Sequence, residues 1–168
     1  ELMKHVIAIN QQRAEATGGN FDSMFAILQQ IQQFSSEKWA MEVSFAYSSL
    51  GPEQELHTQT VANTQPDILD WRLIGEVYQA AVALYCISSF IIPGMGFENV
   101  AATLERSKAI GLAQESCWWT LLKGLKAVAS NQVRQLRKLV LWPLVIAGIV
   151  SRGEGTEVQS FILDELSH

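Results

Sequence analysis

The strongest constraint on the fold is an apolar segment at 73–92, where Glu76 and Gln79 are the most polar side chains. Pro66 and Asp67 precede it, and proline is tolerated at a helix start while an aspartate caps the free amides of the first turn. Apolar residues then fall on nearly every side of the helix, as in helices that are surrounded by others. The segment therefore predicts the buried centre of a helical domain.

A membrane-spanning helix is the alternative reading of the same segment, because its length is close to what a bilayer requires. Glu76 and Gln79 would be costly in lipid, and aromatic and basic anchors do not flank both ends. The second apolar run, 139–150, is too short to span a bilayer. We therefore expect a buried helix and no membrane contact.

Helical periodicity continues along the rest of the chain. In the first third, helices are expected over 2–16 and beginning at residues 20 and 35. The centre should form one helix over 67–92. The remainder should form helices over 99–110, 112–130, 131–142, 144–150 and 156–166. Gly111 marks a break or a close helix contact, and Pro143 forces a kink or a restart. With no sustained strand alternation, the expected fold class is all-α: a compact multi-helix globular domain with two central apolar helices and no significant sheet.

The domain organisation follows from a polar stretch after residue 50 that lacks an apolar period. We expect one helical domain over 1–168, with N-terminal helices at 1–50, an exposed connection at 51–66 and a helical core at 67–168. The chain begins in mid-sequence with neither an initiator methionine nor a signal peptide, which is typical of a fragment of a larger intracellular protein.

Charge is distributed unevenly along the sequence. The net charge of −5 argues against a surface built as a whole to meet nucleic acid phosphates. No acid occurs between Glu115 and Glu154, and Arg134, Arg137 and Lys138 fall on one helical surface in that stretch. Two interpretations stay open: a basic face that binds an acidic partner, and an ordinary solvated face.

Catalytic and metal-binding patterns are not found in the sequence. His5, His57 and His168 lie near the termini or in the polar connection, without the spacing of a zinc site. Cys86 and Cys117 lie in apolar helical segments without a neighbouring base, as structural cysteines do. The carboxylate pairs, Asp67 with Asp70 and Asp164 with Glu165, lie near helix ends, where acids cap or complement the dipole. We expect no catalytic residue, no metal site and no enzyme.

An aromatic set offers one candidate ligand site. Tyr78, Tyr85, Trp118 and Trp142 would line an apolar effector pocket between helices, since such pockets are mainly apolar with few polar groups. Core packing of the same rings is the competing interpretation.

The sequence LVLWPLVIAG at 139–148 resembles the signature helix of the fungal-specific transcription factor domain, the regulatory region of fungal binuclear zinc cluster transcription factors. AAVALYC at 80–86 resembles an apolar helix of that family. VQSFI at 158–162, which follows the glycine turn at 153–155, also resembles a segment of the family. The resemblance covers roughly 67–168, while the first third is similar only in being helical.

The resemblance implies a nuclear protein that carries an N-terminal six-cysteine zinc cluster for DNA binding. Two cysteines cannot build that cluster, so no cofactor is expected in this chain and no direct nucleic acid binding by it. The expected partners are transcription machinery or a second copy, with a small hydrophobic effector. Two alternatives remain: a small helical enzyme or carrier for an apolar molecule, and an interaction module that docks through the apolar face of 158–166 or the basic face around Arg137.

Overall fold

The computed structural model describes residues 2–15, 21–49, 66–91, 100–130, 134–151 and 155–167. These ranges are helical throughout apart from short turns, and none of them contains a strand, which confirms the all-α fold class. The elements are α1 (Leu2–Glu15), α2 (Phe21–Gln32), α3 (Ser36–Ser49), α4 (Ile68–Cys86), the π-helical turn η2 (Ile87–Ile91), α6 (Val100–Ser130), α7 (Arg134–Leu139), α8 (Leu141–Val150) and α9 (Thr156–Ser167).

The start of α4 is fixed by reciprocal capping. Asp67 Oδ1 accepts the backbone N–H of Asp70 at 2.8 Å, and the backbone N–H of Asp67 donates to Asp70 Oδ2 at 3.0 Å. Each carboxylate thereby satisfies an amide that the first helical turn leaves without a partner. The capping role expected for this pair is confirmed.

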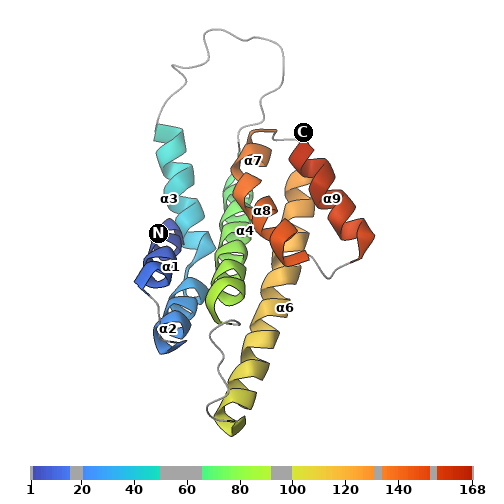
Figure 1. The fold of residues 1–168 in the computed structure, drawn as a ribbon. Coiled ribbons are helices and arrows are strands. Elements are labelled where there is room, and N and C mark those ends of the chain that lie inside the picture. The colour runs from blue at the N-terminus through green and yellow to red at the C-terminus, as the bar shows by residue number, and fades with distance from the viewer. Residues whose placement is uncertain are drawn as a thin grey trace, which may run out of the picture.

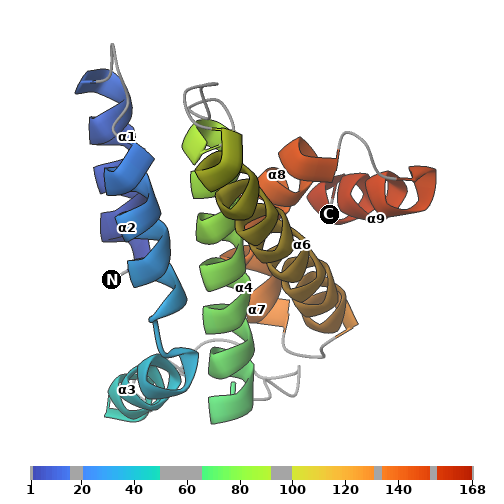
Figure 2. The same ribbon diagram turned by 90° about the horizontal axis from the view of Figure 1, so that it is seen from below.

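Helix α4 is the centre of the molecule, as its apolar pattern predicts. Val77, Val82 and Ala83 are buried although they point to different sides of the helix, because neighbours cover it from several sides. Helices α1, α2 and α3 pack on one side, and α6, α7 and α8 pack on the other (Figures 1 and 2). The substantial contacts between these two groups of helices run through α4.

The end of the central helix differs from a plain α-helix. Residues Ile87–Ile91 form a π-helical turn, in which the Ser88 hydroxyl donates to the Leu84 carbonyl at 2.7 Å. A side-chain hydroxyl that takes a backbone carbonyl competes with the regular ladder. Hydrophobic periodicity does not distinguish this turn from the helix before it.

Helix α6 corrects the expectation at Gly111. The helix runs without a break from Val100 to Ser130, and a Cβ built on Gly111 would meet no atom within 4 Å. Gly111 is therefore neither a break nor a close contact. One glycine costs a helix only about 1 kcal/mol relative to alanine, which helix-forming neighbours and packing on α4 outweigh. The close contact lies at Gly124, where a Cβ would overlap Val77 Cγ2 of α4.

The helix restarts next to Pro143, as expected, but the new helix begins at Leu141 and includes the proline instead of following it. Helix α7 ends at Leu139, Val140 leaves the helical region with φ −98° and ψ 10°, and α8 begins at Leu141. Pro143 then lies in the first turn of α8, where its missing N–H removes no intrahelical bond. The expected connection at 51–66 falls outside the described residues up to position 65.

Candidate functional site

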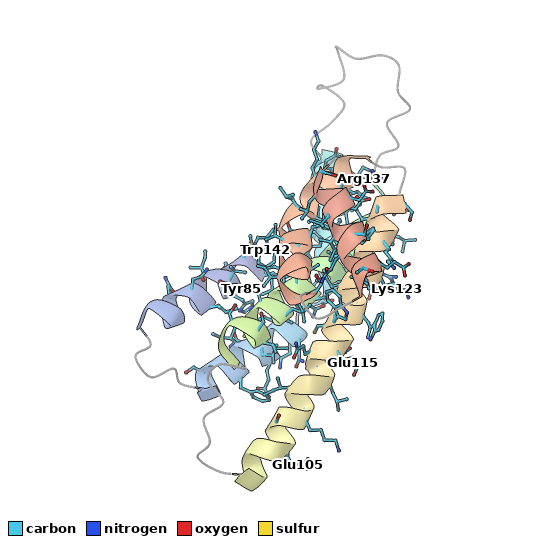
Figure 3. The ribbon with its side chains drawn as sticks, turned by 45° about the vertical axis from the view of Figure 1, so that its right-hand side comes forward. Tyr85, Glu105, Glu115, Lys123, Arg137 and Trp142 are labelled. Atoms are coloured by element: carbon cyan, nitrogen blue, oxygen red, sulfur yellow. The ribbon has the colours of Figure 1, made fainter. Side chains whose placement is uncertain are left out.

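Three of the four aromatic residues proposed as an effector pocket pack on one another. Trp142 of α8 stacks on Tyr78 of α4, with ring centroids 6.1 Å apart and an interplanar angle of 13°. Its other neighbour is Tyr85, whose ring meets it edge-on at 6.1 Å. Figure 3 shows Tyr85 and Trp142 close together between α1 and α8. The indole therefore occupies the space beside the two tyrosines.

The two tyrosine hydroxyls join α4 to its neighbours. Tyr78 donates to the Leu139 carbonyl at 2.6 Å, and Tyr85 donates to Asn10 Oδ1 of α1 at 2.8 Å. Burial raises the pKa of the Tyr78 phenol, so the hydroxyl stays protonated and keeps this donor role. The aromatic group thus links the end of α7, the centre of α4 and the N-terminal helix.

Trp118, the fourth residue, contributes from α6. Its side chain is only 6% exposed and belongs to a core cluster with Leu121 and Leu122, against which Tyr78 and Trp142 pack. All four aromatic residues therefore lie in one region of the core.

A hollow lies next to this group and not within it. Its volume is about 220 Å³, between α2, α4 and α6. It is lined by Ile31, Gln32, Glu76, Gln79, Ala80, Ala83, Ala113, Ser116, Cys117 and Thr120. Alanines on α4 and α6 leave space that larger side chains would fill, and Glu76 is the charged residue of the lining. The sequence analysis missed this hollow because small residues on two distant helices give no local pattern.

The predicted basic face lies at the junction of α6 and α7. Arg137 and Lys138 are exposed, and the Arg137 guanidinium donates to the carbonyl of Ala129 near the end of α6. A cation at that position also complements the negative end of the α6 dipole. Arg137 lies at the opposite end of the molecule from Glu105, and Lys123 lies between Arg137 and Glu115 (Figure 3). The Arg134 side chain falls outside the description.

Helix α8 carries an exposed apolar row that sequence analysis missed. Its inner face buries Leu144, Ile146 and Ala147. Its outer face presents Leu141, Val145 and Ile149, which are 57%, 43% and 49% exposed. These residues are spaced four apart, so they form a continuous row along the helix. We call this row the α8 stripe. A helix that is apolar all round predicts burial, and periodicity gives no indication of which face stays open.

The cysteines are structural in their surroundings. Cys86 is buried and Cys117 is half-buried, and both are thiols. Burial raises the pKa of Cys86 to about 12 and also raises the pKa of Cys117, so both remain protonated at neutral pH. Among the described residues, no group of three or more His, Cys, Asp or Glu side chains is placed to hold a metal ion.

No helix within the described ranges combines the length and the apolar character that crossing a membrane would need.

Family comparison decides what kind of domain this helical assembly is. The model of the fungal specific transcription factor domain matches residues 1–167. The chain belongs to this family. The match extends the resemblance seen over 67–168 to helices α1–α3, and it gives the domain a role in the regulation of transcription. Searches of curated proteins and of solved structures gave no match.

Proposed function

We propose that this fungal transcription factor domain regulates transcription in the intact protein by binding another protein through its α7–α8 surface. We define this surface as the α8 stripe together with Arg137 and Lys138. The observation that carries the proposal is the exposure of three large aliphatic side chains in one row. Rows of this kind on a protein surface mark sites of interaction. The family membership supports transcription as the process that the contact serves.

DNA binding belongs, in this proposal, to another part of the intact protein. The chain carries a net charge of −5, and the α7–α8 surface offers two cations, Arg137 and Lys138. Sequence-independent affinity for DNA requires several cations that face the phosphates together. The six-cysteine zinc cluster that the resemblance implies does not fit here, because the chain has two cysteines, of which Cys86 is buried and Cys117 is half-buried. The family supports a nuclear location for the intact protein.

The test is a substitution on the α8 stripe of the intact transcription factor. Val145→Asp places a charge at an exposed position, so the fold tolerates it while an apolar partner does not. We expect reporter transcription to change at least about threefold, the change that about 0.7 kcal/mol of lost binding produces, with protein level and DNA occupancy unaltered. Phe45→Asp on α3 is the matched control, because Phe45 is 78% exposed and lies outside the surface. Equal reporter output from both variants would contradict the proposal.

The isolated domain provides the DNA arm of the test. Titrated against genomic DNA fragments at physiological salt, it should give no mobility shift, because its acidic surface is repelled by phosphate. Specific retention of one DNA sequence by this domain would overturn that part of the proposal.

Effector binding is a second candidate function, favoured by the hollow between α2, α4 and α6. A small apolar molecule there would contact helices from both sides of α4 and so favour one arrangement of the two helix groups. The aromatic group of Tyr78, Tyr85, Trp118 and Trp142 is the other proposed site, where a ligand would have to replace the Trp142 indole.

NMR spectra with 1-hexanol as the probe distinguish these two sites. Shifts at Ala113 and Cys117 would place the probe in the hollow, and shifts at the Trp142 indole N–H would place it among the aromatic rings. Spectra that stay unchanged to millimolar probe would rule out an effector of this class, since even weak specific binding is visible there.

A further inference from the structure

Helix α9 is attached to the rest of the domain along one narrow side. Its substantial contacts with the other described helices are all with α8, and Figure 2 shows it at the edge of the molecule beyond that helix. The structure describes the whole of α9, in which Ile162 is the one buried side chain and Leu163 is 67% exposed. A helix of 12 residues is marginal by itself in water. The position of α9 therefore depends on a few contacts.

The absence of a side chain at Gly148 makes room for the inner face of α9. A Cβ built on Gly148 would lie 3.6 Å from Ile162 Cγ2, so Ile162 packs directly against this part of α8. Val158 and Phe161 pack on the core cluster to which Ile162 belongs. The three apolar side chains follow one another at three- and four-residue spacings, which is the pattern of a helix bound in a groove.

Charged groups add a second element of recognition. Lys126 of α6 lies over the Phe161 ring, with its Nζ 5.9 Å from the ring centroid. Glu157 and Asp164 lie one turn before and one turn after Phe161, and all three line one surface hollow. Helix α9 as a whole has three acids and no cation, so an acidic helix is attracted to the surface that carries Lys126. The acids of α9 leave this surface whenever α9 does, and they then do not repel an acidic helix that takes its place.

We propose that α9 is an exchangeable occupant of the surface beneath it, and that an acidic amphipathic helix of a partner protein binds there in its place. We call this surface, which includes Gly148 and Lys126, the α9 groove. The partner helix carries apolar side chains with the spacing of Val158, Phe161 and Ile162, and acids one turn from the central one. The inference goes beyond the proposed function, because the α9 groove is not part of the α8 stripe. Since α9 competes within the same chain, the partner gains access only in the fraction of molecules in which α9 is released.

Hydrogen exchange of the wild-type domain tests whether α9 opens by itself. We expect the α9 amides to exchange faster than those of α4 and α6, with little dependence on denaturant, because a local opening exposes little surface. Exchange of α9 only through global unfolding would overturn the inference, since α9 would then be a fixed part of the core.

A fluorescein-labelled peptide with the α9 sequence, TEVQSFILDELS, is the probe for the groove. Ile162→Ala in the domain weakens the competing helix, so it should tighten binding of the unmodified peptide at least about tenfold relative to the wild type. Leu163→Ala is the matched control, because it truncates an exposed side chain of the same helix and should leave the weak binding unchanged. Fluorescence anisotropy measures the affinities, and circular dichroism measures the helix content of each variant.

Substitutions in the groove and in the peptide test what is recognised. Gly148→Leu, added to Ile162→Ala, should weaken peptide binding at least about tenfold, because its side chain fills the space that the peptide isoleucine needs. Gly148→Ala should have little effect, since a methyl group there makes an ordinary contact. A peptide with lysine in place of Glu157 and Asp164 should bind several-fold more weakly, because it places cations beside Lys126.

Three results of the binding experiment would overturn the inference. The first is equal peptide affinity of the Ile162→Ala and Leu163→Ala domains, and the second is a lysine-substituted peptide that binds as tightly as the acidic one. The third is an Ile162→Ala domain that loses most of its helical signal, because the core would then depend on α9 and the helix could not exchange.

Discussion

At the scale of single residues, the contact between α4 and α6 depends on the missing side chain of Gly124. A Cβ at this position would overlap Val77 Cγ2, and Val77 is fully buried and cannot move away. Gly124→Ala should therefore lower the free energy of unfolding by about 1–3 kcal/mol, as overpacking of a core does. Urea denaturation followed by circular dichroism measures the change.

Gly111 is the internal control for this prediction. It lies in the same helix with open space around its Cβ position, so Gly111→Ala should stabilise the protein by about 0.5–1 kcal/mol through helix propensity alone. Equal effects at the two glycines would show that backbone propensity, and not contact with Val77, explains the effect at Gly124.

Cys86 makes stability depend on pH in the alkaline range. Its ordinary thiol pKa of 9.0 rises to about 12 in the folded protein because of burial. The unfolded chain thus loses this proton first as pH rises, so the contribution is complete below pH 9.0 and is lost between pH 9.0 and about 12. The slope contributed by one such group is at most about 1.4 kcal/mol per pH unit.

Urea midpoints of the wild type and of Cys86→Ala measure this contribution. Above pH 9.0 the wild type should lose stability faster than the variant, whose other titrating groups, including Tyr78 and Cys117, are the same. Parallel curves for the two proteins across the alkaline range would contradict a buried, protonated Cys86.

At the scale of elements, Gln79 anchors the end of α2 to the central helix. Its Nε2 lies 2.9 Å from the Ile31 carbonyl, 3.1 Å from that of Phe34 and 3.3 Å from that of Gln32. The Ile31 and Gln32 carbonyls lie in the last turn of α2, where the regular helical donors are missing, and Phe34 follows the helix. The Ile31 carbonyl also accepts the backbone N–H of Phe34 at 3.2 Å. Gln79→Ala should destabilise the protein by about 1–2 kcal/mol and should increase hydrogen exchange first in α2.

Gln79→Glu separates hydrogen bonding from side-chain volume. A carboxylate of nearly the same size offers no N–H and brings a negative charge next to the carbonyl oxygens. Gln79→Glu should therefore destabilise the protein more than Gln79→Ala does. Gln29→Ala, at an exposed position of α2, should change stability by less than about 0.5 kcal/mol. Exchange that increases uniformly over all helices in Gln79→Ala would argue against a local anchor.

The elements also show what the sequence can and cannot predict. The start of α4 is predictable because Asp67 and Asp70 act on amides within one turn of themselves. The restart at Pro143 is predictable for the same reason, since a missing N–H is a local property. The roles of Gly111 and Gly124 are not predictable from the sequence. A glycine within a helix has a packing role only where a residue of another helix contacts it, as Val77 contacts Gly124.

At the scale of the whole molecule, the candidate sites illustrate the same distinction. The four aromatic residues predicted to line one pocket, Tyr78, Tyr85, Trp118 and Trp142, do lie in one region of the core. Their aromatic character did not indicate that the Trp142 ring, stacked on Tyr78, fills the space that a ligand would use. The hollow beside Cys117 and the α8 stripe arise where separate helices fail to cover a surface, and this depends on the arrangement of all of them.

Trp142 connects the two halves of the core. One cluster of buried residues includes Leu121 and Leu144, and a second includes Ile9 and Ile31 of the N-terminal helices. Tyr78, Tyr85, Cys117 and Trp142 pack against both clusters. Tyr78 and Tyr85 belong to α4 itself. Of the other two residues, Trp142 has the larger side chain, so its indole is the main contact outside α4 between the two clusters.

Trp142→Ala should therefore affect cooperativity as well as stability. We expect the free energy of unfolding to fall by about 2–4 kcal/mol. This is toward the lower end of the range for tryptophan truncation, because the indole is only half-buried. Trp119→Ala, at a position 58% exposed on α6, should stay within about 0.5 kcal/mol. Without the shared indole, the N-terminal helices should exchange their amide hydrogens at lower denaturant than α6 and α8 do. If Trp142→Ala lowers stability but all helices still open together, α4 alone couples the two sides of the domain.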